Sequence, residues 1–114
     1  MKQTDYERAR NLFRESLIFN REVGHQNGMT ASVAGLAKLA SSEGKLSRAA
    51  QLYGIVEARV AAVGLQLMIM DKSEFDNGVS VLRAQMDEKT LAKFWAKGKA
   101  MSFDDAIAFA LEEK

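Results

Sequence analysis

Apolar residues recur along most of the chain at spacings of three and four, the period that gathers side chains on one face of an α-helix. In the first such segment Tyr6, Phe13 and Leu17 share a face, and Gly24 follows as a C-terminal glycine would. No segment keeps the period of two that a strand requires. We therefore predict an all-α fold of about six helices, at residues 5–23, 29–43, 46–63, 72–86, 88–99 and 103–112.

Polar residues at two of the predicted helix starts match known capping patterns. Ser102 with Asp105 three residues later resembles a capping box, and Asp87 directly precedes the helix predicted from residue 88. The triplet at 76–78, Asp-Asn-Gly, is typical of a turn. Because the apolar spacing continues through this triplet, we predict that the helix runs on without a break.

One predicted connection is unusual because it is almost entirely apolar. Residues Leu65–Met70 join two predicted helices, where polar side chains are the rule. We expect this stretch to fold back over the core. The alternative is an exposed apolar patch that binds a partner.

Two kinds of apolar residue have both a structural and a binding interpretation. Trp95 lies in an apolar helical stripe, which favours a core position, although a tryptophan beside Phe94 is also able to stack on a ligand. The methionines Met68, Met70 and Met86 either fill gaps in the core or offer an adaptable contact surface. We favour core packing for both kinds.

The charge pattern argues against several classes of partner. The formal net charge is +1 and the acidic and basic residues are interspersed, so the chain lacks a domain-wide footprint for nucleic acid. Lys93, Lys97 and Lys99 lie close together, and we interpret them as a solvated helix face rather than a basic patch. The start lacks an apolar signal core and no apolar run is long enough to span a bilayer. We predict a cytoplasmic protein that contacts neither membrane nor nucleic acid.

Candidate catalytic and metal-binding residues are few. The single histidine, His25, lies in a polar stretch without a second ligand at a metal-binding spacing, and the chain has no cysteine. Neighbouring carboxylates such as Asp104 and Asp105 point about 100° apart on a helix, so they do not form an acid–base pair. We expect no metal, no cofactor and no enzymatic activity; an enzyme would need a polar cleft built from these surface groups.

The first and third predicted helices repeat one another at an offset of 40 residues, counted from Arg8 to Arg48. The matching pairs sit at cap and core positions: Arg8-Ala9 with Arg48-Ala49, Leu12-Phe13 with Leu52-Tyr53, and Val23-Gly24 with Val63-Gly64. An internal repeat of this kind is the signature of stacked helical pairs, in which each unit covers the apolar face of its neighbour.

The second and third predicted helices resemble a tetratricopeptide unit. The first-helix ladder is matched by Val33, Leu36, Ala37 and Ala40, the turn by Gly44, and the second-helix signature by Ala49, Tyr53 and Val56. The first predicted helix resembles the second helix of a preceding unit, so the chain begins half-way through a repeat and we expect it to be part of a longer protein. The usual repeat has about 34 residues, and we expect the extra residues at 24–28. Val33 and Ala61 depart from the aromatic and the proline common in the family.

The whole chain also resembles the C-terminal tetratricopeptide-like region of large bacterial ATPase-containing transcriptional regulators of the LuxR/MalT-like and SARP-like kinds. The resemblance rests on residues 5–17, 35–50 and 94–111, and the last of these segments begins Phe-Trp-Ala-Lys-Gly-Lys-Ala-Met-Ser. The resemblance is most specific over Trp95–Leu111. It implies one domain over 1–114, with repeat helices at 1–64, capping helices at 71–114 and a right-handed superhelical stack. It also implies a protein-interaction or effector-sensing module, with ATPase and DNA-binding modules elsewhere in a longer protein.

The repeat geometry suggests two candidate contact surfaces. In tetratricopeptide-like stacks the first helix of each unit lines a concave surface, so Thr30, Lys38 and Ser41 are candidate contacts for a protein or peptide, or for another domain of the parent protein. The alternative function is homo-oligomerisation. With no helix before it, the first predicted helix would expose Tyr6, Phe13 and Leu17, and two copies would form a homodimer through that face.

Overall fold

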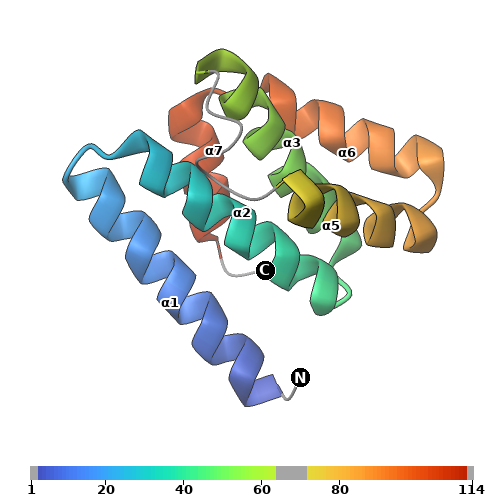
Figure 1. Ribbon diagram of the computed structural model, residues 1–114, viewed down its shortest axis with the longest axis horizontal. Helices are drawn as coiled ribbons and strands as arrows, with labels where there is room; N and C mark the ends of the chain where they lie inside the picture. The colour runs from blue at the N-terminus through green and yellow to red at the C-terminus, as the bar shows by residue number, and fades with distance from the viewer. Residues whose placement is uncertain (1–2, 64–71, 113–114) are drawn as a thin grey trace.

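A computed structural model describes residues 3–63 and 72–112 of the chain, and every regular element in these ranges is a helix (Figure 1). The helices are α1 (Gln3–Glu22), α2 (Gln26–Ser42), α3 (Leu46–Val63), α5 (Lys72–Gln85), α6 (Glu88–Ala100) and α7 (Phe103–Leu111). The predicted all-α fold is therefore confirmed for this part of the chain. The apolar stretch Leu65–Met70 lies outside the described residues, so its predicted path over the core stays a prediction.

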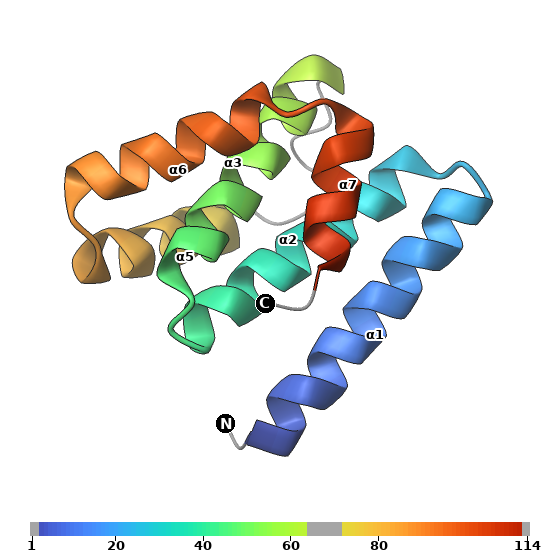
Figure 2. The same ribbon diagram turned by 180° about the vertical axis from the view of Figure 1, so that it is seen from behind.

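Helix α3 lies at the centre of the molecule. α1, α2 and α3 pack in chain order, each against the next, but the most extensive packing of α3 is with α6 rather than with α5. α5 contacts α2 and α3, and α7 returns to contact α1, α2 and α3 (Figure 2). Because α3 has neighbours on so many sides, every residue from 49 to 56 is buried.

Two glycines allow α3 and α6 to approach closely. A methyl group at Gly54 of α3 would overlap the carbonyl oxygen of Trp95, and one at Gly98 of α6 would overlap the carbonyl oxygen of Gln51. Small residues at a crossing let two helix backbones come together. The α3–α6 contact therefore depends on the absence of a side chain at both positions.

The helix ends follow the polar residues and glycines of the sequence. Gly24 and Gly44 have φ values of +73° and +79°, the left-handed conformation expected of C-terminal glycines. The side chains of Asp87 and Ser102 accept hydrogen bonds from the backbone N–H of Thr90 and Asp105, so both predicted caps are confirmed.

The start of α2 differs from the prediction because a histidine caps it. His25 Nδ1 accepts a hydrogen bond from the Gly28 N–H at 3.1 Å, and α2 begins at Gln26 instead of residue 29. Residues 24–28, where a long loop was predicted, therefore contain mostly helix. Histidine is not among the common capping residues, so the sequence did not signal this start.

Candidate protein-binding groove

The three α2 residues predicted to point outward have different environments. Lys38 is exposed, but Thr30 and Ser41 are 3% and 9% accessible, so the prediction is wrong for these two. Helix α2 packs against both α1 and α3, which leaves only part of its surface in solvent. The Thr30 hydroxyl is used inside the helix, where it donates to the Gln26 carbonyl oxygen at 3.1 Å.

Lys38 and Ser41 nevertheless share a groove with a second element. This groove, of about 320 Å³, lies between the C-terminal half of α2 and α5, with the buried Tyr53 of α3 beneath them. Figure 1 shows α5 beside the C-terminal half of α2. The remaining lining residues are Ser42, Asn77, Gly78 and Val81. Val81 is 52% exposed on α5, while Lys38 carries a positive charge on α2. The groove thus presents a cation, hydroxyl groups and an apolar side chain to a single segment.

The Tyr53 hydroxyl is the polar group at the base of this α2–α5 groove. It lines the groove and forms no hydrogen bond within the described parts of the chain. Burial raises the pKa of the Tyr53 phenol above its ordinary value of 10.0, so the hydroxyl is a protonated donor at neutral pH. A donor removed from most of its water gains free energy when it meets an acceptor.

Gly78 makes room for this hydroxyl. α5 continues through the Asp-Asn-Gly triplet as predicted, and a methyl group at Gly78 would overlap the Tyr53 hydroxyl oxygen. The glycine therefore reflects a contact with α3 rather than a turn. Gly78 was the one feature of the sequence that pointed to the Tyr53 hydroxyl in the groove. The repeat pattern identified Tyr53 only as a core aromatic residue.

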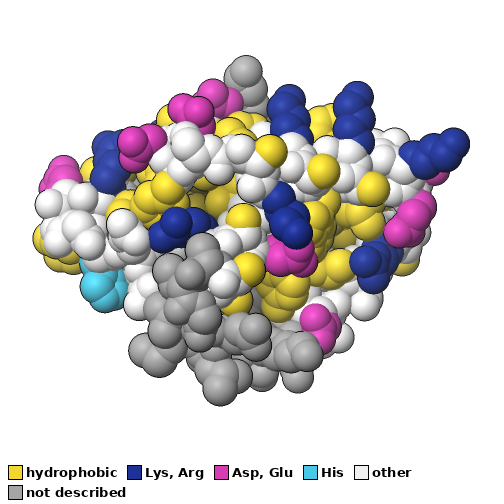
Figure 3. Space-filling model, turned by 90° about the horizontal axis from the view of Figure 1, so that it is seen from above, with side chains coloured by type: hydrophobic (Ala, Val, Ile, Leu, Met, Phe, Trp, Pro, Cys, Tyr) yellow, Lys and Arg dark blue, Asp and Glu magenta, His cyan; other side chains and the backbone are white. Residues whose placement is uncertain are grey.

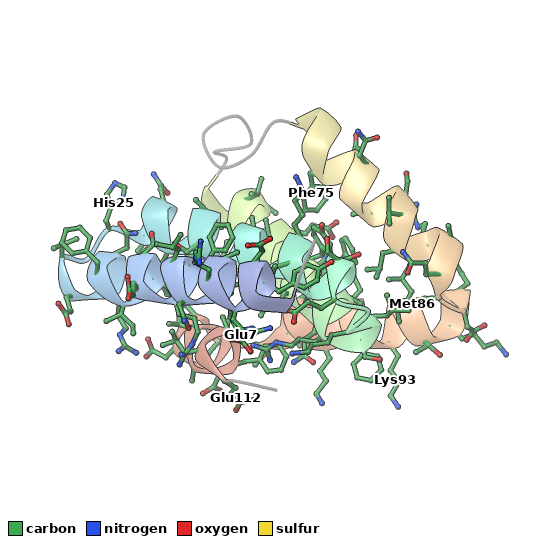
Figure 4. The ribbon with its side chains drawn as sticks, turned by 90° about the horizontal axis from the view of Figure 1, so that it is seen from below. Glu7, His25, Phe75, Met86, Lys93 and Glu112 are labelled. Atoms are coloured by element: carbon green, nitrogen blue, oxygen red, sulfur yellow. The ribbon has the colours of Figure 1, made fainter. Side chains whose placement is uncertain are left out.

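Two aromatic rings hold Tyr53 in place. Its ring centroid lies 5.5 Å from that of Phe75 in an edge-to-face contact and 6.2 Å from that of Trp95 in a nearly parallel one. Phe75 and Trp95 also contact each other edge to face at 6.2 Å. Figure 4 shows Phe75 on α5, beside the helices against which it packs. Trp95 thus belongs to the packed aromatic cluster, and the cluster fixes the direction in which the Tyr53 hydroxyl points.

A second hollow, of about 400 Å³, lies between the start of α3 and helices α6 and α7. Leu46, Phe94 and Phe109 provide its apolar lining. Three of its four polar side chains have partners: Lys45 lies 3.9 Å from the Glu43 carboxylate, Arg48 donates to carbonyl oxygens of α7, and the Gln51 amide contacts the Met101 sulfur at 3.3 Å. This hollow offers apolar surface but fewer available polar groups than the α2–α5 groove.

The lysines of α6 form part of a mixed-charge face. Lys93, Lys97 and Lys99 are exposed, and Lys93 extends away from the helix (Figure 4). Lys99 pairs with Glu57 at 3.0 Å, and the Lys93 ammonium lies 5.6 Å from the Phe94 ring centroid. Figure 3 shows basic side chains standing along one edge with acidic and apolar side chains among them. This pattern is typical of a solvated helix face.

Two arginines donate hydrogen bonds to the C-terminal end of α7, and no pattern in the sequence marks them for this role. Arg14 donates to the Leu111 carbonyl oxygen at 2.8 Å, and Arg48 donates to those of Phe109, Ala110 and Glu112 at 3.1, 3.1 and 2.7 Å. Cations near the last carbonyls of a helix stabilise it. These arginines therefore tie α7 to both α1 and α3.

The face of α1 that was predicted to be exposed points inward. Leu17 is fully buried, Phe13 is half-buried against Gly35 of α2, and the Tyr6 hydroxyl donates to the Ser42 carbonyl oxygen at 3.2 Å. The exposed apolar residues are instead Leu12 and Phe19 of α1 and Val23 directly after it, at 62%, 63% and 59% accessibility. The prediction that Tyr6, Phe13 and Leu17 are exposed is therefore wrong, because α2 covers that side.

Among the described residues no three His, Cys, Asp or Glu side chains converge on a possible metal position, and no helix there combines the length and apolar character needed to cross a membrane. None of the protein-family models, curated proteins or solved structures compared with the chain matches it.

Proposed function

We propose that this chain is a protein-interaction module and that a segment of its partner binds in the α2–α5 groove. The observation that carries the proposal is the Tyr53 hydroxyl, a protonated donor with no acceptor in the described chain, at the base of the groove. Lys38 on α2 and Val81 on α5 flank it. These groups suit a segment that presents a carboxylate and a backbone carbonyl next to an apolar side chain.

The internal repeat supports a tetratricopeptide-like arrangement for this module. α1, α2 and α3 pack in chain order through glycine turns, as successive helices of stacked pairs do. Further units would extend such a stack into the right-handed superhelix typical of the family. In that arrangement α2 is the first helix of its unit, so its exposed side, with Lys38, belongs to the concave surface where peptides bind.

The setting that we propose is the C-terminal region of a cytoplasmic bacterial transcriptional regulator. The resemblance of residues 94–111 to such regulators is its support. The partner is then a signalling protein, or another domain of the same regulator, and the module responds by binding rather than by catalysis. The separately expressed remaining domains of that regulator should bind the chain, and no association at high micromolar concentration would contradict this setting.

The groove itself is tested with peptides selected from a random display library on the wild-type chain. We expect an acidic residue close to an apolar residue in the selected peptides. Tyr53→Phe removes only the donor and Lys38→Glu reverses the charge, so each should weaken binding by about tenfold, the loss of one hydrogen bond or ion pair worth about 1.4 kcal/mol. Lys93→Glu, an equal charge change on α6, should leave the affinity unchanged.

Two outcomes would contradict the groove proposal. One is a set of peptides that binds Tyr53→Phe and Lys38→Glu as tightly as wild type, which would locate binding elsewhere. The other is equal loss of binding in the Lys93→Glu control, which would indicate a general electrostatic effect.

A further inference from the structure

The outer face of α1, formed by Leu12 and Phe19 and continued by Val23 directly after the helix, is exposed in the described structure. The three residues are spaced by seven and four positions, so they lie on one side of the helix. Figures 1 and 2 show α1 along the edge of the molecule, with no helix on its outer side. Single exposed apolar residues are ordinary on a protein surface, but three large ones along one side of a helix are a candidate interaction site.

Helix α3 is the repeat counterpart of α1, and its side that corresponds to the outer face of α1 packs against α7. Arg48 donates to the carbonyl oxygens at the C-terminal end of α7, while the Arg59 guanidinium lies 4.2 Å from the Phe103 ring centroid at the N-terminal end of α7. Leu52 lies between these arginines on the same side of α3 and is fully buried. This side of α3 is therefore covered by a helix that runs antiparallel to it.

The internal repeat maps that side of α3 onto the outer face of α1. Counted by the offset of 40 residues, the pairs are Arg8 with Arg48, Leu12 with Leu52, Phe19 with Arg59 and Val23 with Val63. The side of α3 that packs against the antiparallel helix α7 thus corresponds to an exposed side of α1. At one of these pairs a charged arginine, Arg59, is replaced by an apolar phenylalanine, which suits a partner surface that is itself apolar.

We propose that two copies of this chain associate through the outer faces of α1, with the two helices antiparallel. A two-fold axis between Glu15 and Ser16 sets Leu12 opposite the second copy's Phe19, and by symmetry Phe19 opposite the second copy's Leu12. This register buries the two large apolar residues of each copy against each other. It involves none of the residues of the α2–α5 groove, so it stands or falls independently of peptide binding there.

The charges on α1 are complementary in this register. Arg8 and Glu22 are both exposed, and neither forms an ion pair with any described residue. They lie along the same edge of the outer face. In a two-fold antiparallel pair, this edge of one helix packs beside the same edge of the second copy's helix, with the chain running in the opposite direction. Arg8 of one copy therefore meets Glu22 of the second copy at both ends of the interface.

One feature of the register opposes association. Glu15 lies on the same edge as Arg8 and Glu22, close to the two-fold axis, so the two Glu15 carboxylates approach each other. Like charges in contact reduce stability. Removal of this charge should therefore strengthen the dimer, a result that a merely sticky apolar surface does not predict.

Sedimentation velocity over low to high micromolar concentrations tests the proposal. The wild type should change from a 12.6 kDa monomer to a dimer across this range. Phe19→Ser and Leu12→Ser should each weaken association by at least tenfold. Val81→Ser, which removes an apolar residue of similar exposure from α5, should leave association unchanged. A strictly monomeric wild type, or equal loss in Val81→Ser, would overturn the proposal.

Charge variants test the register. Arg8→Glu should weaken the dimer, and the double variant Arg8→Glu/Glu22→Arg should restore it, because the exchanged charges still meet across the axis. Glu15→Gln should tighten it severalfold. Circular dichroism would check that each variant remains helical. Association that survives Arg8→Glu, or a double variant no better than the single one, would refute the antiparallel register.

Cysteine cross-linking provides a direct geometric test, because the chain has no cysteine of its own. A disulfide needs Cα atoms within about 7 Å. Glu15→Cys lies next to the two-fold axis and should form a disulfide-linked dimer on mild oxidation. Arg8→Cys would lie about 22 Å from its counterpart in the antiparallel pair, from a rise of about 1.5 Å per residue, and should not cross-link. Efficient cross-linking at position 8 would indicate a parallel pair instead.

Discussion

Gly98→Ala is expected to destabilise the protein even though alanine is the better helix former. A methyl group at Gly98 would overlap the carbonyl oxygen of Gln51, and would lie 3.0 Å from the Gln51 carbonyl carbon and 3.1 Å from the Ile55 nitrogen. All three atoms belong to the backbone of α3, so no side-chain rotation relieves the overlap. The two helices must move apart at the place where they pack most extensively.

The size of the effect follows from two opposing terms. Alanine in place of a helical glycine gains about 1 kcal/mol. Overpacking a close-packed site costs about 1–3 kcal/mol, and overlap with a fixed backbone favours the upper end. The net expectation is a loss of about 2 kcal/mol in the free energy of unfolding, or about 8 °C in Tm for a domain of this size.

Urea unfolding followed by circular dichroism measures this loss, and Ala96→Gly serves as the matched control. Ala96 lies on the exposed side of the same helix, so its replacement isolates the propensity term and should cost about 1 kcal/mol. If Gly98→Ala is as stable as the wild type or more stable, α3 and α6 do not approach as closely as described.

Three further predictions concern other parts of the structure. Arg48→Met should lower the free energy of unfolding by about 1–2 kcal/mol in urea denaturation, because the carbonyl oxygens at the end of α7 lose a charged donor; an unchanged stability would contradict this role. The raised pKa of Tyr53 means that the stability supplied by its protonated phenol is complete below pH 10 and declines as the pH rises toward the folded-state pKa. Tyr53→Phe should therefore flatten the fall of the urea midpoint above pH 10, and parallel curves for the two proteins would refute the assignment. His25→Asp should raise Tm slightly, because aspartate is the stronger cap for the Gly28 N–H. His25→Ala removes the cap and should lower the free energy of unfolding by about 1 kcal/mol.

Local features of the fold could be predicted from the sequence because local interactions determine them. The caps at Asp87 and Ser102, the left-handed glycine at 24 and the glycine turn at 44 depend on a few neighbouring residues, and all were correctly predicted. The neighbours of α3 could not be predicted in this way. Its packing against α6 depends on two glycines far apart in the chain, Gly54 and Gly98, neither of which marks a helix end.

The candidate surfaces were harder to predict for a related reason. Apolar residues cover much of α1, so the helical period alone does not decide whether the side of Leu17 or the side of Leu12 packs inward. Only the position of α2 decides it, and Leu17 is the buried residue. Lys38 was correctly expected to be exposed, but the groove beside it exists only because α5 folds back toward α2.

The return of α6 to the centre of the molecule limits how this domain can change in evolution or by design. In a linear array of repeats, an end unit can be deleted or duplicated with little effect on the others, because each contacts only its neighbours. Here the largest contact of α3 is made by a helix from the C-terminal third of the chain. A truncation before residue 88 would remove α6 and expose the surface of α3 that packs against it. The chain should therefore unfold as one cooperative unit that cannot be shortened repeat by repeat.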